Sequence, residues 1–481
     1  MRAIKFLALL LISNTLFAQS QGSLDPESIE QLEKDQKIKN FTKNESYSLT
    51  LQGAIELGLR KNYSENIRKY QFELNEMGFQ DAFEDFYMPK LNLTMASSTD
   101  HHVENLYKES DSSAQSARTP NGSIGLELED YTLFNWGKDY IDYLNSKESY
   151  ARAKTSFKEK RRALRHSIID QYFNLSRQFQ IVQAYKRQLS HSSFIYRLAK
   201  EKLSLKKIRT QEFLQAKSLF LASHQNYQSS LNDYYEIQDE MATLLGHELK
   251  SSYWPAEILK FKPVTLAQSE SLPFIERNNP NLLQARANMN ISTRSYQRAI
   301  KDNLPLPKIS LKLGSYQRSF SSAGQNDNYE TFDGSKNLEV VATVNMSWRI
   351  YGSGGFFNSR KTQSSFLSKK ISEIELKETH RSVKVANRVI HSQLRYLEKK
   401  LEATKAYLRN ARKAFDQTVD DYLASKVSLT TLQQILDDLI SSQVQYENTK
   451  YQHLSEKVNL AELMGLDDFP GDNFDKLTRE L

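Results

Sequence analysis

The sequence is poor in the residues that break or cross-link a chain. Its 481 residues include no cysteine, 16 glycines and 10 prolines. Without cysteine there is no disulfide, no thiolate metal site and no cysteine to carry a lipid at a mature N-terminus. The scarcity of glycine and proline, together with 26% charged and 11% aromatic residues, favours long amphipathic helices over a set of compact cores.

The chain also lacks an apolar run of the roughly 20 residues that a membrane-spanning helix needs. The N-terminus, "MRAIKFLALLLISNTLFAQS", has two basic residues, an apolar run over 6–12 and then small polar residues. This pattern predicts a secretory signal peptide over 1–18, with cleavage after Ala18. The net charge of +7 is spread along the chain, so it predicts no nucleic-acid partner. We expect an exported protein without a helical membrane anchor.

The same order of segments occurs twice along the chain. "MPKLNL" at 88–93 and "LPKISL" at 306–311 each follow a helical stretch and open an alternating one. A polar loop, a second alternating segment, a very long helical stretch and a returning helix that ends at a glycine come next in each half. We predict an N-terminal extension (19–47), a first repeat (48–249), a linker (250–271), a second repeat (272–466) and a loose C-terminal tail (467–481).

Four short segments alternate apolar and polar residues with a period of two, which predicts β-strands. Their approximate bounds are 90–99, 122–133, 308–320 and 337–350. One interpretation is a sheet on a protein core. The other is a set of membrane-barrel strands, apolar outside and wet inside, which the charged groups on one face favour.

A barrel built from this chain requires several copies. Four strands cannot close a barrel, because the smallest barrels have about eight. An open strand edge in lipid costs several kcal/mol for each unpaired backbone group. Three copies would supply twelve strands and a water-filled lumen.

Two stretches without proline, about 138–204 and 356–424, predict very long helices. At about 1.5 Å per residue, each would be ~100 Å long. In the second stretch, residues from Leu394 to Phe415 step strictly three and four apart, which predicts a coiled-coil seam.

Several motifs together resemble the TolC family of outer-membrane efflux proteins. They are the Leu49–Asn62 pattern, the Asn278-Asn279-Pro280 run, and the joints "LFNWGKD" (133–139) and "RIYGSGGFF" (349–357). The resemblance covers about 48–466 and rests on the order and duplication of these motifs. It implies a mainly α fold with membrane β-structure: a homotrimer whose twelve-stranded β-barrel in the outer membrane of a Gram-negative bacterium continues into a periplasmic α-helical barrel. It also implies a periplasmic adaptor, an inner-membrane pump of RND or ABC type and contact with outer-membrane lipid.

The residues at the helix–strand joints are read as a membrane boundary. Proline stops a helix and is tolerated as the first residue of a strand, and lysine can keep its ammonium in water there. The helix-to-strand joints are Pro89–Lys90 and Pro307–Lys308, and the strand-to-helix joints hold Gly137, Gly352, Gly354 and Gly355. We interpret six aromatic residues as an interfacial belt, the alternative being packing between helices: Phe86, Tyr87, Phe134, Trp136, Trp348 and Tyr351.

The resemblance places a constriction where the long helices turn back. Tyr422 matches the family's turn tyrosine, while Ser425 and Lys206 stand at its glycine positions. Thr431 and Gln434 occupy the positions of the entrance aspartates. We predict that Tyr422 and nearby polar bonds hold a closed tip. The other candidates are Glu212, at the first acidic position of the first turn, the pair Asp437 and Asp438 one turn further on, and the cations Lys207, Arg209 and Lys426, which with Lys206 form either a solvated loop or an adaptor-docking surface.

No catalytic, cofactor or metal site is predicted. "GSGG" (352–355) lacks the Lys-Ser/Thr of a P-loop, and His101 and His102 fall in a predicted external loop. We expect a passive outer-membrane duct of a tripartite efflux or type I secretion system, with small molecules or a secreted protein as cargo. The alternative is a structural or adhesive coiled-coil protein of the envelope without channel activity.

Overall fold

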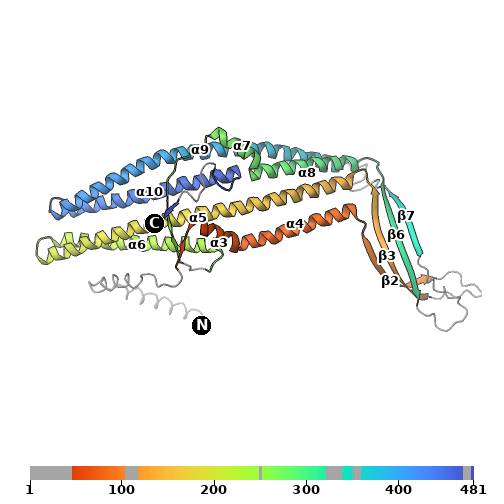
Figure 1. The fold of residues 1–481 in the computed structure, drawn as a ribbon, viewed down its shortest axis with the longest axis horizontal. Helices are drawn as coiled ribbons and strands as arrows, with labels where there is room; N and C mark the ends of the chain where they lie inside the picture. The colour runs from red at the N-terminus through yellow and green to blue at the C-terminus, as the bar shows by residue number, and fades with distance from the viewer. Residues whose placement is uncertain are drawn as a thin grey trace, which may run out of the picture.

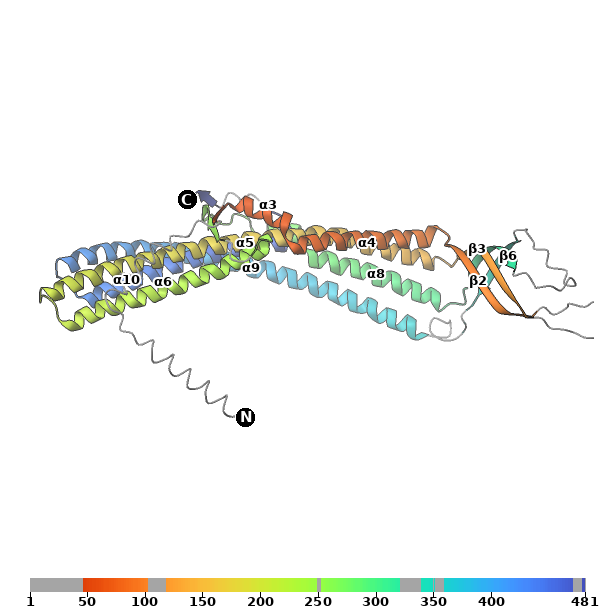
Figure 2. The same cartoon turned by 90° about the horizontal axis from the view of Figure 1, so that it is seen from below.

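The computed structural model describes residues 46–102, 118–248, 252–320, 339–348, 350, 359–469 and 478–480. The chain forms an elongated body of long helices with a sheet at one end (Figures 1 and 2). The predicted signal peptide, nearly all of the N-terminal extension and Tyr351, Gly352, Gly354 and Gly355 lie outside the described residues.

The predicted order of elements occurs twice. The first repeat holds α3 (Leu51–Lys61), α4 (Tyr63–Tyr87), β2 (Leu91–His102), β3 (Arg118–Phe134), α5 (Lys138–Ser204) and α6 (Thr210–Leu245). The second holds α7 (Gln268–Asn278), α8 (Pro280–Asp302), β6 (Lys308–Phe320), β7 (Glu339–Ser347), α9 (Ser359–Leu423) and α10 (Leu429–Met464). The helix–hairpin–long helix–helix duplication is therefore confirmed.

Short strands join the ends of the repeats near the middle of the molecule. β1 (Ser46–Leu49) pairs in parallel with β4 (Ser252–Pro255). β5 (Glu257–Leu259) pairs antiparallel with β8 (Thr478–Glu480). The C-terminal tail is thus not simply a loose extension, because three of its residues form a strand on the linker.

The sheet at the far end is antiparallel with the strand order β2–β3–β6–β7. Its registers pair Leu93 with Leu126 and Leu311 with Val344. The described helices do not cover the apolar face: Leu91, Leu93, Leu126, Val344 and Met346 are 49–65% exposed. On the other face Glu127 forms an ion pair with Lys312. This exposure argues against a sheet packed on a protein core.

Next to the sheet, four helices lie side by side in the order α4–α5–α8–α9. Stacked aromatic rings join α4 to α5. The ring of Phe79 lies 4.8 Å from that of Tyr150 at an interplanar angle of 4°, and Phe86 stacks on Tyr143 at 5.2 Å. Aromatic pairs of this kind contribute about 0.5–1.5 kcal/mol beyond the area they bury.

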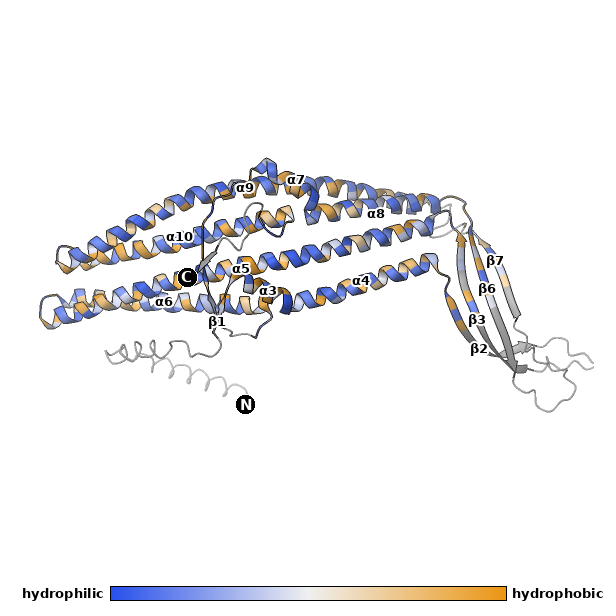
Figure 3. Ribbon diagram, viewed as in Figure 1, coloured by the Kyte–Doolittle hydropathy of each residue, from blue (hydrophilic) through white to orange (hydrophobic). Residues whose placement is uncertain are grey.

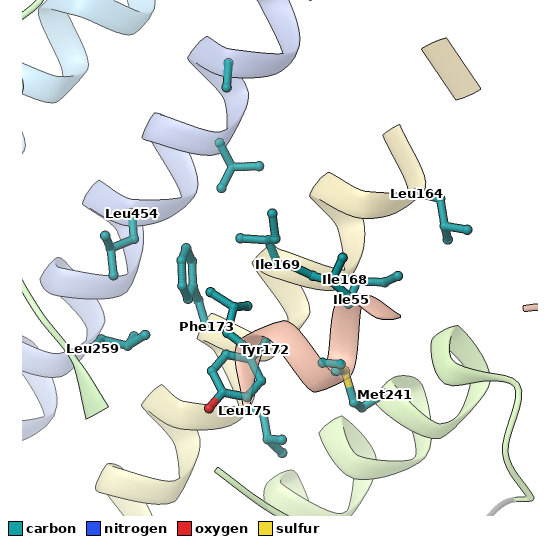
Figure 4. Close-up of a cluster of buried hydrophobic side chains, with 14 of the residues drawn as sticks. Ile55, Leu164, Ile168, Ile169, Tyr172, Phe173, Leu175, Met241, Leu259 and Leu454 are labelled. Carbon is teal, nitrogen blue, oxygen red and sulfur yellow. The ribbon is translucent and has the colours of Figure 1, made fainter. Parts of the chain in front are cut away.

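In the other half, α5 pairs with α6 and α9 pairs with α10, and α5 contacts α10. The coiled-coil seam predicted for α9 is buried against α10 from Leu394 through Leu397 and Leu401 to Phe415. Where the two halves of the body meet, Ile168, Tyr172 and Phe173 of α5 form a core with residues of α3, α6 and α10 (Figure 4). Figure 3 shows that the helices carry this apolar surface in stripes between polar faces.

A duplicated asparagine ties the returning helix of each repeat to the start of the second helix of the same repeat. In the first repeat, the Asn62 amide donates to the carbonyl of Leu244 (2.9 Å), and its Oδ1 accepts from the Glu65 N–H at the start of α4. Asn279 repeats the arrangement with the Leu463 carbonyl (2.9 Å) and the Leu282 N–H (3.0 Å). One side chain therefore caps one helix and satisfies the end of another.

A glycine completes each of these joints. Gly246 (φ 67°) and Gly465 (φ 65°) end α6 and α10 in the left-handed conformation. A Cβ on Gly246 would lie 2.4 Å from the Lys61 carbonyl oxygen, and one on Gly465 would lie 2.3 Å from that of Asn278. Only glycine combines this backbone conformation with so close an approach.

We expect Gly465→Ala to lower the thermal midpoint, because its Cβ clashes with a backbone oxygen and the alanine is held at positive φ. Together the clash and the unfavourable backbone conformation should lower the free energy of unfolding by about 2 kcal/mol or more. The matched control is Gly78→Ala, in mid-α4 with no atom within 4 Å of the added Cβ, which should raise stability by about 0.5–1 kcal/mol. Melting followed by circular dichroism measures both, and equal effects would contradict the prediction.

A buried group of ionisable side chains fastens the linker to the α9–α10 pair. The Lys457 ammonium donates to the Lys262 carbonyl (2.6 Å), and the Glu398 carboxylate accepts from the Val264 N–H (2.7 Å). His453 is fully buried 3.5 Å from Glu398. Burial lowers the pKa of His453 to about 4, with a further lowering by Lys457 that Glu398 opposes.

This shift makes the fold sensitive to acid. Because the pKa of His453 is below its unfolded value of about 6.5, the unfolded chain takes up the proton first as the pH falls. Stability is therefore lost between about pH 6.5 and pH 4, by on the order of 3 kcal/mol from this group. His453→Gln should flatten the dependence of the melting temperature on pH in that window. His380→Gln, at a histidine 40% exposed, is the control, and equal slopes in both variants would refute the assignment.

Candidate functional site

The candidate site is the pair of turns at the end of the molecule opposite the sheet. The turn from α5 to α6 (205–209) and the turn from α9 to α10 (424–428) lie at the same end (Figure 1). We call this end the tip. It brings together seven of the candidate residues: Lys206, Lys207, Arg209, Glu212, Tyr422, Ser425 and Lys426.

The two turns have the same backbone geometry although neither contains glycine. Lys206 (φ 56°) and Ser425 (φ 60°), at the family's glycine positions, both adopt the left-handed conformation. The N–H of Lys207 donates to the carbonyl of Lys202, and that of Lys426 to Asp421, both at 2.8 Å. These bonds close the ends of the long helices in the Schellman manner. Holding each non-glycine residue there costs about 1 kcal/mol.

Tyr422 lies at the junction of the two hairpins. The Lys202 ammonium of α5 stands 5.0 Å from the centre of the Tyr422 ring. The ring is half-buried beside an apolar cluster that contains Leu429 and Leu432. Burial raises the pKa of Tyr422, and the charge of Glu212 raises it further. Tyr422 thus contacts both hairpins of one chain, and Lys202 is a partner that no sequence motif indicated.

At the family's acidic positions, α10 carries neutral side chains. Thr431 is used to start the helix, since the Ser428 hydroxyl accepts from its N–H (3.2 Å) and lies 3.0 Å from its hydroxyl. Gln434 is exposed. Further along α10, Asp437 accepts a hydrogen bond from Gln188 of α5 (3.0 Å), and partial burial and Asp438 raise its pKa. The carboxylates thus lie about one turn further along α10 than Gln434.

The four cations of the tip are all exposed. Lys426 lies 3.5 Å from Asp421, a pair whose side chains are 71% and 46% exposed. Within the described parts of the chain, no carboxylate forms an ion pair with Lys206, Lys207 or Arg209. The turn residues themselves therefore present a surplus of positive charge.

At the other end, the strand-to-helix joint of the first repeat is bound to the helix-to-strand joint of the second. Trp136 (φ 56°) and Gly137 (φ 74°) make a left-handed corner. The Trp136 indole N–H donates to the Pro307 carbonyl (3.0 Å), and the Lys301 ammonium donates to the Trp136 carbonyl (2.7 Å). Lys308 begins β6 as predicted, while Lys90 precedes β2 and forms an exposed ion pair with Asp85 (2.8 Å).

Asp302, at the end of α8, holds this joint together and was not predicted. Its carboxylate lies 3.2 Å from the Lys138 ammonium and 2.7 Å from that of Lys361, so it connects α5, α8 and α9. Burial raises the pKa of Asp302, but the hydrogen bonds and charges of Lys361 and Lys138 outweigh it, and the pKa is lowered overall. An isolated aspartate in a helical sequence gives no signal for such a role.

The predicted aromatic belt divides into two groups. Tyr87, Phe134, Trp136 and Trp348 are 39–51% exposed, which leaves the belt a prediction for them. Phe86 instead stacks on Tyr143 between α4 and α5. His101 and His102, predicted in an external loop, are the last residues of β2.

Known proteins share this architecture. A family model described as "Outer membrane efflux protein" matches residues 274–466. The Campylobacter jejuni CmeC outer membrane channel has a TM-score of 0.73 at 16% identity, over 89% of this chain and 88% of that one. The Vibrio cholerae outer membrane protein VceC has a TM-score of 0.71 at 14% identity, over 86% of this chain and 96% of that one. The open Neisseria gonorrhoeae MtrE channel has a TM-score of 0.69 at 14% identity, over 87% of this chain and 89% of that one. Among curated proteins nothing matches.

The fold is therefore that of the TolC-like channels. The second repeat, over residues 274–466, also matches the model of the outer membrane efflux protein family. The known structures that share this fold, CmeC and MtrE among them, are outer membrane channels. None of the described helices has the length and apolar character needed to cross a bilayer.

We expect Tyr422→Ala to raise the conductance of the purified channel in planar bilayers, because it removes the ring that contacts Lys202 and the apolar cluster. Tyr407→Ala is the matched control, since Tyr407 lies on the same helix and is 44% exposed. If Tyr422→Ala conducts like the wild type, Tyr422 does not hold the tip closed.

Proposed function

We propose that three copies of this chain form one continuous tube. Twelve strands, four from each copy, close a barrel in the outer membrane, and the helices form the wall of a periplasmic duct. The tube is a passive conduit. Its energy comes from an inner-membrane pump of RND or ABC type, joined through a periplasmic adaptor that docks at the tip. Small molecules or a secreted protein are the cargo.

The observation that carries this proposal is the sheet with two open edges. β2 and β7 lie at the two margins of the four-stranded sheet, and among the described residues each has a neighbouring strand on one side only. In lipid an unpaired strand edge is too costly to persist. Pairing β7 of one copy with β2 of the next satisfies both edges without changing the sheet.

The helices support the same arrangement. α4 and α9 lie at the margins of the helical layer next to the sheet. On α4, Tyr63, Ile67, Tyr70, Leu74 and Met77 form an apolar stripe that is 56–73% exposed. α9 carries a matching stripe that includes Leu367, Ile371, Ile374, Val385 and Val389, at 54–64% exposure. Rows of exposed apolar side chains such as these mark an interface. Packing the α9 stripe of one copy on the α4 stripe of the next continues the order of the strands.

The alternative of a coiled-coil envelope protein without channel activity is set aside by the family match. The experiment that tests the proposed assembly is the protein mass of the mature chain purified from outer membranes, by light scattering in detergent with the micelle subtracted. A mass of three chains supports the tube. A monomer leaves both strand edges open and would overturn it.

The apolar stripe on α4 provides a sharper test. Leu74→Glu places a charge in the proposed interface but on the surface of the single chain, where Leu74 is 67% exposed. We expect the detergent-purified variant to shift from three chains to one while its helix content is unchanged. Glu73→Lys, at the exposed neighbouring position, changes the charge outside the stripe and should leave the mass at three chains. A trimeric Leu74→Glu variant would place the interface elsewhere.

A further inference from the structure

The two turns at the tip have one shape but different charge. Aligning the two left-handed residues, Lys206 and Ser425, places 197–214 opposite 416–433. The first segment has six basic and two acidic residues, a net charge of +4, and the second has one basic and three acidic residues, a net charge of −2. Each protomer therefore keeps a net charge of +2 at the tip, even if the two segments neutralise each other between copies.

The positive charges lie at the extreme end of the molecule. Lys206, Lys207, Arg209 and Lys426 are exposed residues of the turns themselves. The carboxylates of the second hairpin, Asp416, Asp420 and Asp421, stand behind the turn on the last part of α9, and Asp421 faces Lys426. A solute that approaches the end of the tube meets the ammonium and guanidinium groups first.

On α10, which follows the second turn, negative charge comes only at a distance. Thr431 and Gln434, at the start of α10, are neutral. Asp437 is nine residues beyond the helix cap Ser428, or about 14 Å at ~1.5 Å per residue. The Debye length at physiological ionic strength is about 8 Å. The field of Asp437 and Asp438 is thus largely screened at the turn. The nearer carboxylates, Asp421 beside Lys426 and the exposed Glu212, are outnumbered there by the four cations.

We infer that the periplasmic mouth of this channel prefers anions, and that its cargo is an anionic solute. The inference rests on the proposed trimeric tube, in which three copies set a ring of these cations around the mouth. Rings of Lys and Arg side chains select anions in pores, and a focused positive field raises the local concentration of anions. The same cations would face the adaptor in an assembled system, so the test uses the purified channel alone.

The experiment is the reversal potential of the channel in planar bilayers with a KCl gradient. We expect chloride to be more permeant than potassium in the wild type, with a preference that shrinks as both solutions approach 1 M, where the Debye length is about 3 Å. Lys206→Glu combined with Lys207→Glu should move the permeability ratio to favour potassium. Lys206→Gly, which suits the left-handed backbone, should lower the anion preference without inverting it and guards against a misfolded double variant.

The matched control changes two exposed lysines far from the mouth on the same helix, Lys154→Glu with Lys158→Glu, and should change the ratio much less. A wild type that favours potassium, or a double tip variant with the wild-type ratio, would overturn the inference and leave the tube intact. A monomeric protein or the absence of any conductance would instead contradict the proposed function.

Discussion

The architecture depends on the rule that a backbone within lipid must satisfy its own hydrogen bonds. The described part of the chain provides four strands of one sheet, and β2 and β7 each leave one edge unpaired. The helical layer next to the sheet is also unfinished at its margins, where α4 and α9 carry exposed apolar stripes. A set of elements that is incomplete in both its sheet and its helices, and incomplete at the same two margins, is what the proposed wall of a larger closed structure requires.

Duplication accounts for how such a wall stays rigid along its length. The Asn62–Gly246 and Asn279–Gly465 joints use one asparagine and one glycine to fix the entry and exit of two helices. At the boundary with the sheet the repeats are instead bound to each other, through Trp136 on Pro307 and Asp302 between two lysines. The first device acts within a repeat and could arise by copying. The second joins one repeat to the other and so has no counterpart that copying alone would supply.

Features that rest on a regular period were predictable from the sequence. The strands follow from period-two alternation, and the seam from Leu394 to Phe415 follows from its three-four spacing; both are present. Features that rest on a single contact between distant parts of the chain were not predictable from the sequence. Phe86 looks like an interfacial aromatic until α5 supplies Tyr143, and the tail looks loose until β5 supplies an edge for it. The contacts of Tyr422 with Lys202 and of Asp302 with two lysines belong to the same class, because each joins helices whose relative register no local pattern encodes.

At the tip, the residue type that suits the backbone conformation differs from the residue type that is present. A left-handed turn residue is least costly as glycine, and the bonds that close both turns, Lys207 to Lys202 and Lys426 to Asp421, require that conformation. The chain nevertheless has Lys206 and Ser425 there, each at about 1 kcal/mol. The backbone shape is retained in both turns while the side chains differ, so shape cannot be what distinguishes them. What Lys206 adds over glycine is an exposed ammonium at the end of the tube, next to Lys207 and Arg209. At Lys206 the strain thus accompanies an exposed charge at the tip, whereas at Ser425 it accompanies none, and the same helix-ending bonds are kept in both turns.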